Sequence, residues 1–127
     1  MKPILLIITL LVSSLSLQAQ DLKLGLPVGH TSGISSAVFS PDGTKILTAS
    51  WDETARLWES SSGALIHSLE GHTDYVNSAV FSPDGTKILT ASKDGTARLW
   101  ESSSGKLIHS LEGHTSYVSF AVFSPDG

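Results

Sequence analysis

The sequence predicts an all-β protein built from repeated four-stranded antiparallel sheets, and three observations support this. A 42-residue block, Gly29–Glu70, is followed directly by a near copy, Gly71–Glu112, and then by 15 residues of a third copy that reach Gly127. Within each block, short segments with period-two alternation are separated by turn residues. No stretch shows sustained helical periodicity. Because such a sheet has two apolar faces, neighbouring repeats are expected to stack face to face.

Each block is expected to contain four short strands joined by turns. In the first block the turn residues are Pro41-Asp42-Gly43, Asp52-Glu53 and the polar run 59–63, because proline fixes φ, glycine accepts positive φ and aspartate favours turns. The strands between these turns are predicted at residues 37–39, 45–50, 54–58 and 64–69. The second block repeats the pattern 42 residues later, which indicates an antiparallel meander in each copy.

Residues 1–20 have the features of a secretory signal peptide. Lys2 precedes the apolar run Ile4–Val12, and a small residue near the cleavage site is available, with Ala19 or Gln20 as the last residue removed. The apolar run is too short to span a bilayer, which takes about 20 residues. We therefore expect an exported protein, periplasmic or secreted, with no membrane insertion after cleavage. An uncleaved N-terminal anchor is the alternative.

The composition argues against charged partners and against disulfides. The chain has 8 basic and 12 acidic residues and a net charge of −4, without basic clusters. It therefore offers no electrostatic reason to bind nucleic acid or an anionic membrane. It has no cysteine, although exported proteins can form disulfides. Packing and hydrogen bonds alone must hold the fold.

Three motifs recur at the 42-residue period. Gly-His occurs at 29–30, 71–72 and 113–114, FSPDG at 39–43, 81–85 and 123–127, and Arg-Leu-Trp at 56–58 and 98–100. With these motifs the chain resembles WD-repeat β-propellers, although Trp58-Glu59 and Trp100-Glu101 stand where that family has Trp-Asp. Propellers of the periplasmic Pro-Asp type share FSPDG but usually lack the other two motifs, so they rank second.

The resemblance implies four-stranded antiparallel β-propeller blades in an incomplete ring. Two full WD-type repeats cover 29–70 and 71–112, part of a third covers 113–127, and residues 21–28 correspond to a lead-in outer strand. The chain then supplies three outer strands, three innermost strands and two of each middle strand, whereas a propeller has about four to eight blades. We interpret Gly127 as a break within a longer reading frame. Exposed blade faces are expected to favour self-association or aggregation.

The resemblance also implies a buried structural network in each full repeat, in which four side chains satisfy one another's hydrogen bonds. The corresponding residues are His30, Thr48, Asp52 and Trp58 in the first repeat and His72, Thr90, Asp94 and Trp100 in the second. Ser50 or Ser92 is the alternative source of the hydroxyl group. The third copy supplies only His114.

Serine, histidine and aspartate in each repeat are also the residue types of a nucleophilic triad. Their identical recurrence in two repeats favours a structural role, so we expect no catalytic residue and no enzyme. The same recurrence explains the five histidines without a metal site. Asp42-Gly43 and Asp94-Gly95 fit tight turns better than a calcium loop. We expect neither a metal nor a cofactor.

The two full repeats differ at only seven positions, and six of these fall in two groups. The groups are residues 32–35 against 74–77, and Trp51 and Glu53 against Lys93 and Gly95. In a WD-type blade both groups lie on one face, around the narrow end of the channel. The candidate partner-binding residues are therefore Trp51, Tyr75, Lys93, Tyr117 and Phe120. Drift of exposed loops where packing is indifferent is the alternative.

The expected function is a non-catalytic scaffold that mediates protein–protein interaction with an unidentified partner. Fold alone does not fix function, so this expectation depends on the family resemblance. One alternative is the propeller segment of an enzyme or ligand-binding protein whose active part lies beyond Gly127. The other alternative is a nonfunctional gene fragment.

Overall fold

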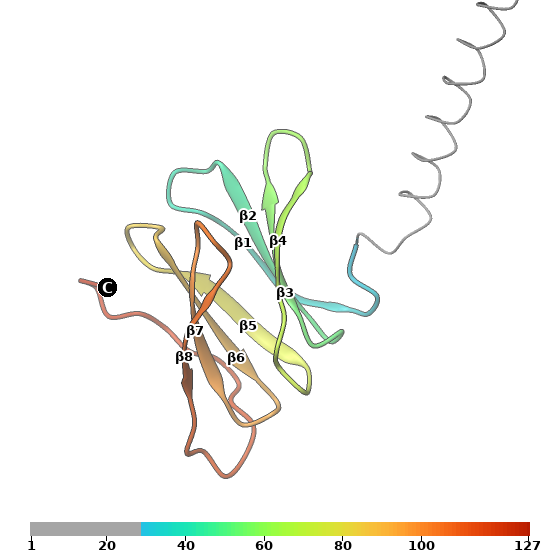
Figure 1. Ribbon diagram of the computed structural model, residues 1–127, viewed down its shortest axis with the longest axis vertical. Helices are drawn as coiled ribbons and strands as arrows, with labels where there is room; N and C mark the ends of the chain where they lie inside the picture. The colour runs from blue at the N-terminus through green and yellow to red at the C-terminus, as the bar shows by residue number, and fades with distance from the viewer. Residues whose placement is uncertain (1–28) are drawn as a thin grey trace, which may run out of the picture.

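The computed structural model describes residues 29–127, and these residues form two four-stranded antiparallel sheets. The first sheet contains β1 (Ile34–Phe39), β2 (Lys45–Ser50), β3 (Ala55–Glu59) and β4 (Leu65–Leu69). The second contains β5 (Val76–Phe81), β6 (Lys87–Ser92), β7 (Ala97–Glu101) and β8 (Leu107–Leu111). Each sheet keeps its strands in chain order, and the two sheets pack together through β1, β2 and β5 (Figure 1). The predicted all-β fold of four-stranded antiparallel sheets is confirmed.

The strand bounds differ from the prediction mainly at the start of each sheet. β2 has the predicted bounds, and β3 and β4 each begin one residue later than predicted. β1 begins at Ile34 rather than at residue 37, because Ile34 and Ser36, which precede the apolar run, also pair with β2. Ser36 lies opposite Ala49, and Ile34 lies opposite Ser50 across an irregularity in the register. Backbone pairing does not require apolar side chains, so a prediction based on the apolar run alone made the strand too short.

The FSPDG motif forms the turn between β1 and β2. The Asp42 carboxylate accepts hydrogen bonds from the Thr44 backbone N–H at 3.0 Å, from Ser40 Oγ at 2.7 Å and from Thr44 Oγ1 at 2.8 Å. These bonds favour the charged form and lower the pKa of Asp42 to about 2. Because the carboxylate is used within its own turn, the geometry is that of a tight turn.

The core lies between the two sheets. Its buried apolar side chains come from both repeats: Leu47, Ala49, Ala55, Leu57, Leu69, Val76, Ala79, Ile88 and Trp100. Burying each leucine or isoleucine contributes on the order of 1.5 to 3 kcal/mol. A single sheet is one layer thick, so its apolar face is buried only by the neighbouring repeat. The repeats therefore stack face to face.

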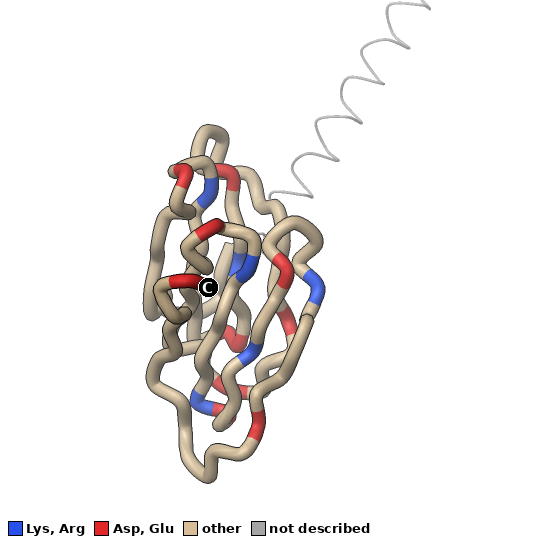
Figure 2. The backbone as a smooth tube through the Cα atoms, turned by 90° about the vertical axis from the view of Figure 1, so that its left-hand side faces the viewer, with Lys and Arg blue, Asp and Glu red and all other residues tan. Residues whose placement is uncertain are grey.

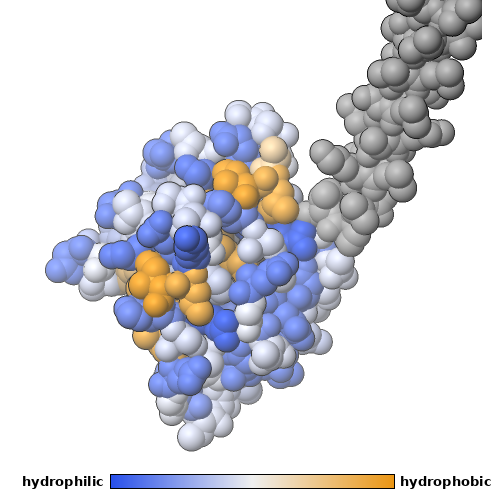
Figure 3. Space-filling view, viewed as in Figure 1, coloured by the Kyte–Doolittle hydropathy of each residue, from blue (hydrophilic) through white to orange (hydrophobic). Residues whose placement is uncertain are grey.

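A position is buried or exposed according to which repeat lies beside it. Leu69 at the end of β4 is fully buried, whereas Leu111 at the end of β8 is 49 % exposed. Conversely, Val76 in β5 is fully buried, whereas Ile34 in β1 is 58 % exposed. Apolar side chains consequently reach the surface in separate places (Figure 3). The outer faces of the pair of sheets are the surfaces that the described residues leave open.

The innermost strand predicted for the third copy is absent from the structure, in which residues 113–127 contain no strand. β1 is paired with β2 and β5 with β6, but the sequence reaches Gly127 before a counterpart of these partner strands. The segment nevertheless lies along the second sheet, where the Val118 N–H donates to the Ser92 carbonyl at 2.9 Å. The predicted signal peptide (1–20) and lead-in strand (21–28) lie outside the described residues and stay predictions.

Candidate binding face

Four side chains of the second repeat form one hydrogen-bonded network. Trp100 Nε1–H donates to Thr90 Oγ1 at 2.9 Å, and Thr90 Oγ1 lies 2.7 Å from His72 Nε2. The other ring nitrogen, His72 Nδ1, lies 2.7 Å from Asp94 Oδ2. His72 precedes β5, Thr90 is on β6, Asp94 is in the following turn and Trp100 is on β7. The network therefore ties a loop and a turn to two strands of the sheet.

The hydrogen bonds of this network fit a neutral His72. An indole only donates, so Thr90 Oγ1 accepts from Trp100. The Thr90 O–H donates to His72 Nε2 at 2.7 Å, which is nearer than its other acceptor, the Arg98 carbonyl at 3.4 Å. His72 Nδ1–H donates to Asp94. Burial lowers the pKa of His72, although the hydrogen bond and charge of Asp94 oppose this. Burial raises the pKa of Asp94, but hydrogen bonds from Thr96, His72 and backbone N–H groups outweigh it and hold that pKa well below its usual value.

The first repeat contains the same network. Trp58 Nε1–H donates to Thr48 Oγ1 at 2.9 Å, which lies 2.6 Å from His30 Nε2, and His30 Nδ1 lies 2.8 Å from Asp52 Oδ2. Burial raises the pKa of Asp52, but hydrogen bonds from Thr54, His30 and the backbone lower it to about 2. Trp58 is only half-buried, because the described residues leave this face of the first sheet open. The structure thus brings together all eight residues that the resemblance implied.

A threonine supplies the hydroxyl group of each network, and Ser50 and Ser92 do not. Ser92 Oγ accepts the Asp94 backbone N–H at 3.0 Å and donates to the Tyr75 carbonyl at 2.8 Å. It therefore fastens the turn after β6 to the start of β5. Both ring nitrogens of His72 are used within the network, so this histidine is not placed to activate a serine.

In the second repeat, the glycine of the Gly-His motif is favoured by its backbone conformation. Gly71 has a φ of 137°, which side-chain-bearing residues rarely adopt. A Cβ atom at this position would also collide with the guanidinium group of Arg98 on β7. Glycine therefore allows Arg98 to lie against the backbone directly before His72.

A row of side chains crosses the junctions between repeats at the end of the sheets where β1 and β5 begin. Trp51 stacks on Tyr75 of the next repeat, with ring centroids 5.6 Å apart and planes at 23°. Trp51 also lies against Gly33, where a Cβ atom would come within 3.0 Å of the indole. Lys93, the counterpart of Trp51, has its Nζ 5.2 Å from the centroid of the Tyr75 ring and lines a hollow together with Tyr117. We call Trp51, Tyr75, Lys93 and Tyr117 the inter-repeat row.

Residues that differ between the repeats are matched to one another through these contacts. The first repeat combines Gly33 with Trp51, and the second combines Tyr75 with Lys93 at the same positions. The wide indole uses the space above glycine, whereas the lysine ammonium gains a cation–π contact worth about 0.5 to 1 kcal/mol. Packing therefore constrains which residues fit at these positions. Trp51 nevertheless stays 49 % exposed and Tyr75 43 % exposed.

Glu53 and Gly95 occupy a turn position whose backbone favours glycine. Both residues occupy a turn position with positive φ, 73° at Glu53 and 86° at Gly95. Glycine adopts this backbone freely, whereas a residue with a Cβ atom loses roughly 1 kcal/mol. The turn backbone therefore favours glycine at both positions, and at Gly95 a Cβ atom would also come within 3.3 Å of the Ser116 carbonyl oxygen.

At its second junction the inter-repeat row borders a hollow of about 330 Å³. It is lined by Asn77, Lys93, Tyr117 and Ser119, and we call it the Lys93 pocket. Ser119 was not among the predicted contacts, and its signal in the sequence is its position 42 residues after Asn77. Phe120, which was predicted as a contact, is highly exposed but does not line this pocket.

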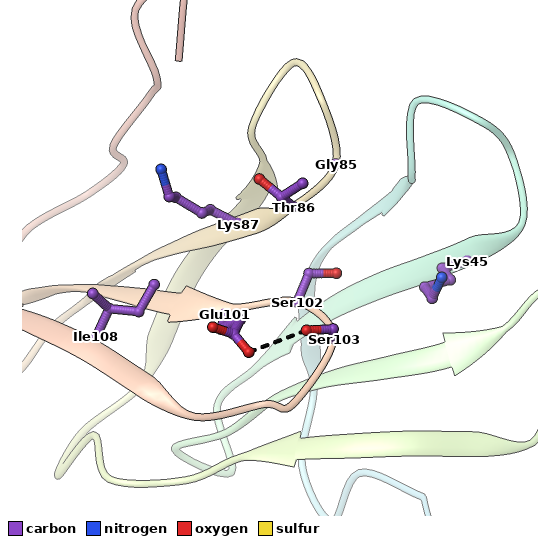
Figure 4. A pocket seen from close by; sticks show the side chains of 8 residues that line it. All are labelled: Lys45, Gly85, Thr86, Lys87, Glu101, Ser102, Ser103 and Ile108. Atoms are coloured by element: carbon purple, nitrogen blue, oxygen red, sulfur yellow. Dashed lines mark hydrogen bonds between the residues drawn. The ribbon is translucent and has the colours of Figure 1, made fainter.

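Two larger hollows lie elsewhere on the described residues. One of about 580 Å³ lies between Lys45 of the first sheet and the second sheet, where Ser103 Oγ donates to the Glu101 carboxylate at 3.1 Å (Figure 4). The other, of about 460 Å³, is lined mainly by the Val-Phe-Ser-Pro residues of the three copies. Both linings use positions that are identical between the copies, whereas the Lys93 pocket uses positions that vary.

Charge and metal-ligand residues are dispersed over the described part of the chain. Lysines and arginines are interspersed with aspartates and glutamates along the backbone (Figure 2). Within residues 29–127, no group of three His, Cys, Asp or Glu side chains is placed to hold a metal ion. Over the same residues, no helix has the length and apolar character needed to cross a membrane.

Stacked four-stranded meanders, each with a His–Asp–Thr–Trp network, define the blades of a WD-type β-propeller in an unclosed arrangement. The family of the WD domain, G-beta repeat, matches residues 23–59, 63–101 and 105–127, which is more than half of the chain. The chain therefore belongs to the WD-repeat family. The second matched unit runs from β4 through β7, so its phase differs from that of the 42-residue blocks.

Curated relatives match single stretches of the chain. An uncharacterized WD repeat-containing protein of Synechocystis is 51 % identical over 43 residues, which is 33 % of this chain and 12 % of that protein. The small ribosomal subunit protein RACK1 of Drosophila melanogaster is 41 % identical over 59 residues, 43 % of this chain and 18 % of the relative. The guanine nucleotide-binding protein subunit beta of Schizosaccharomyces pombe is 54 % identical over 33 residues, which is 26 % of this chain and 11 % of that protein. The matched stretch thus spans less than a fifth of each of these relatives.

Proposed function

We propose that this chain is an exported, non-catalytic WD-repeat platform that binds a protein partner through the inter-repeat row. The observation that carries the proposal is the row itself. Repeat-specific positions place half-exposed aromatic rings and a lysine side by side across two junctions, on blades that are otherwise nearly identical. Tyrosine and tryptophan are enriched at protein interfaces, because they combine a large apolar area with a polar donor.

The names of the relatives support a role in binding other proteins. They include a small ribosomal subunit protein, a guanine nucleotide-binding protein subunit beta and the MST50-interacting protein 11. Each name refers to an assembly or to an interaction. The non-catalytic part of the proposal is supported by the two buried networks, in which histidine and aspartate bond to each other and to threonine.

Export is supported by the residue pattern at the N terminus. Lys2, the apolar run Ile4–Val12 and the small residue Ala19 follow the order of a signal peptide. N-terminal sequencing of the mature product is expected to give a chain that begins at Gln20 or Asp21. An intact Met1 in a cytoplasmic product would contradict export.

A photo-crosslinking amino acid at Tyr75 tests the binding face. Introduced there in the cell that makes the chain, it should give a discrete adduct with one partner. The matched control is Ser62, which lies in the exposed turn between β3 and β4, at the opposite end of the sheet. The Trp51→Ala variant should weaken the Tyr75 adduct at an unchanged amount of folded chain. Equal adducts at both positions, or none at Tyr75, would count against the inter-repeat row as an interface.

A further inference from the structure

The Lys93 pocket has a lysine where the corresponding place at the first junction has a tryptophan. The counterparts at the first junction are Ser35, Trp51, Tyr75 and Asn77. There the indole of Trp51 stacks on Tyr75 and occupies the space beside it. At the second junction Lys93 replaces tryptophan, and a hollow of about 330 Å³ lies between repeats. A repeat-specific substitution therefore accompanies the pocket.

Every lining residue of the Lys93 pocket carries a hydrogen-bond donor, and none carries a carboxylate. Asn77 Nδ2 donates to a backbone carbonyl of the third copy at 2.9 Å, which fixes one wall. Among the described residues, the Lys93 ammonium and the Tyr117 and Ser119 hydroxyl groups have no hydrogen-bond acceptor. Three donors thus border the pocket without protein partners from this part of the chain.

The charge around the pocket fits one carboxylate group. In the second repeat the Asp74 carboxylate lies beside Tyr75 and accepts its backbone N–H at 2.7 Å, whereas the third copy has the neutral Ser116 before Tyr117. Lys93 supplies a single positive charge, which one carboxylate balances, whereas a phosphate group carries nearly two negative charges. Because a cation–π contact is weaker than a charge-assisted hydrogen bond, the contact with Tyr75 does not prevent the ammonium from binding an anion.

We propose that the Lys93 pocket binds a carboxylate of the partner polypeptide, with Lys93 as the charged donor and Tyr117 and Ser119 as hydroxyl donors. The inference rests on the proposed protein-binding function and names the chemical group that the partner supplies. That group is an aspartate or glutamate side chain, or the carboxylate at the end of the partner chain. The adjoining Trp51 and Tyr75 rings supply apolar contact beside it.

Three capped peptides test the proposal and separate the two sources of the carboxylate. Ac-Ala-Glu-Ala-NH₂ carries only a side-chain carboxylate, Ac-Ala-Ala-Ala-OH carries only a terminal one, and Ac-Ala-Gln-Ala-NH₂ carries none. Each is titrated into the ¹⁵N-labelled chain while the backbone amide shifts of Lys93, Tyr117 and Ser119 are followed. A single charged contact gives affinity in the millimolar range, so titration to about 20 mM is required.

Matched lysine variants separate the pocket from general attraction to a positive charge. Lys93→Met keeps the apolar stem and is expected to weaken binding of the acidic peptide at least about tenfold, whereas Lys93→Arg keeps the charge and should stay within about threefold. Lys106→Met is the control, because the first repeat carries the apolar Ala64 at that position. It should leave binding unchanged.

Binding by either or both carboxylate peptides, combined with loss in Lys93→Met, supports the proposal and identifies the source. Equal binding of the glutamine peptide, unchanged affinity in Lys93→Met with an otherwise unchanged spectrum, or no binding by any peptide overturns it. If no peptide binds while the crosslinker at Tyr75 still captures a partner, the protein-binding function is supported and the carboxylate site is refuted. If the carboxylate peptides bind while the crosslinker at Tyr75 captures no partner, the carboxylate site is supported and the proposed partner-binding function is not.

Discussion

Replacing Thr90 by valine tests whether the buried network holds the second blade. Valine has nearly the shape of threonine, so the substitution removes a hydroxyl group with little change in packing. Thr90 is fully buried, and its hydroxyl group accepts the Trp100 N–H at 2.9 Å and lies 2.7 Å from His72 Nε2. After substitution, the indole N–H and the imidazole nitrogen both remain buried without a partner.

The expected loss follows from these two unsatisfied groups. Each costs about 1 to 3 kcal/mol when buried, so Thr90→Val should lower the free energy of unfolding by about 2 to 6 kcal/mol. Thr90→Ser keeps the hydroxyl group and removes one methyl group, at a cost of about 1 kcal/mol. Thr48→Val should cost less than Thr90→Val, because water reaches the half-buried Trp58 of the first repeat.

Urea unfolding followed by far-ultraviolet circular dichroism and tryptophan fluorescence measures these differences. An unchanged slope of free energy against urea would show that the variants unfold from comparable native states. The reasoning is refuted if Thr90→Val is as stable as Thr90→Ser. If Thr48→Val lowers the free energy of unfolding as much as Thr90→Val does, the argument that water compensates the loss at Trp58 is refuted.

Three further predictions concern the turn, the ring pair and pH. Glu53→Gly is expected to raise the free energy of unfolding by about 0.5 to 1 kcal/mol, because glycine relieves the positive φ of 73°; thermal unfolding measures it. A double-mutant cycle of Trp51→Ala and Tyr75→Ala should give a coupling energy of about 1 kcal/mol in urea unfolding, because the rings stack. Stability should fall as pH drops below the ordinary His72 pKa of 6.5, since the folded pKa is lower and the unfolded chain binds the proton more readily. A second loss should begin below the ordinary Asp94 pKa of 3.8, since the folded carboxylate resists protonation, and urea midpoints at about pH 7, 5 and 3 measure both steps.

Each of these predictions has an outcome that contradicts it. A destabilised Glu53→Gly variant would mean that the glutamate side chain makes contacts worth more than its backbone strain. Additive effects of the Trp51 and Tyr75 substitutions would remove the coupling between repeats. A urea midpoint that stays constant from about pH 7 to 3 would contradict the lowered pKa values. Asp94→Asn is the control that should reduce the more acidic step, and the remainder comes from other carboxylates with lowered pKa values, such as Asp42 and Asp52.

Much of the fold could be predicted from the sequence because the decisive signals are local. Alternation and turn residues gave β2 with its final bounds, and recurrence gave the stacking of repeats. The third innermost strand was predicted from the same signal and is absent from residues 113–127, because a strand requires a paired neighbour as well as a suitable sequence.

The candidate site could be predicted only in part. The family resemblance pointed to the network residues, but the choice of Thr90 over Ser92 depends on which hydroxyl group faces His72. The variable positions pointed to Trp51 and Tyr75 separately, and their stacking depends on how two blades are rotated against each other.

The sequence by itself determined the repeat and the strand order within a blade, because these follow from alternation, turn chemistry and recurrence along the chain, and its resemblance to WD-repeat proteins pointed to the residues of the structural network. Only the tertiary structure decided that Trp51 occupies the space over Gly33 and that Lys93 borders a pocket with Tyr117. It also showed that Gly95 has a positive φ, which glycine adopts freely. Contacts between blades join residues that the chain separates, and their geometry is fixed by packing between two surfaces, which no local pattern encodes.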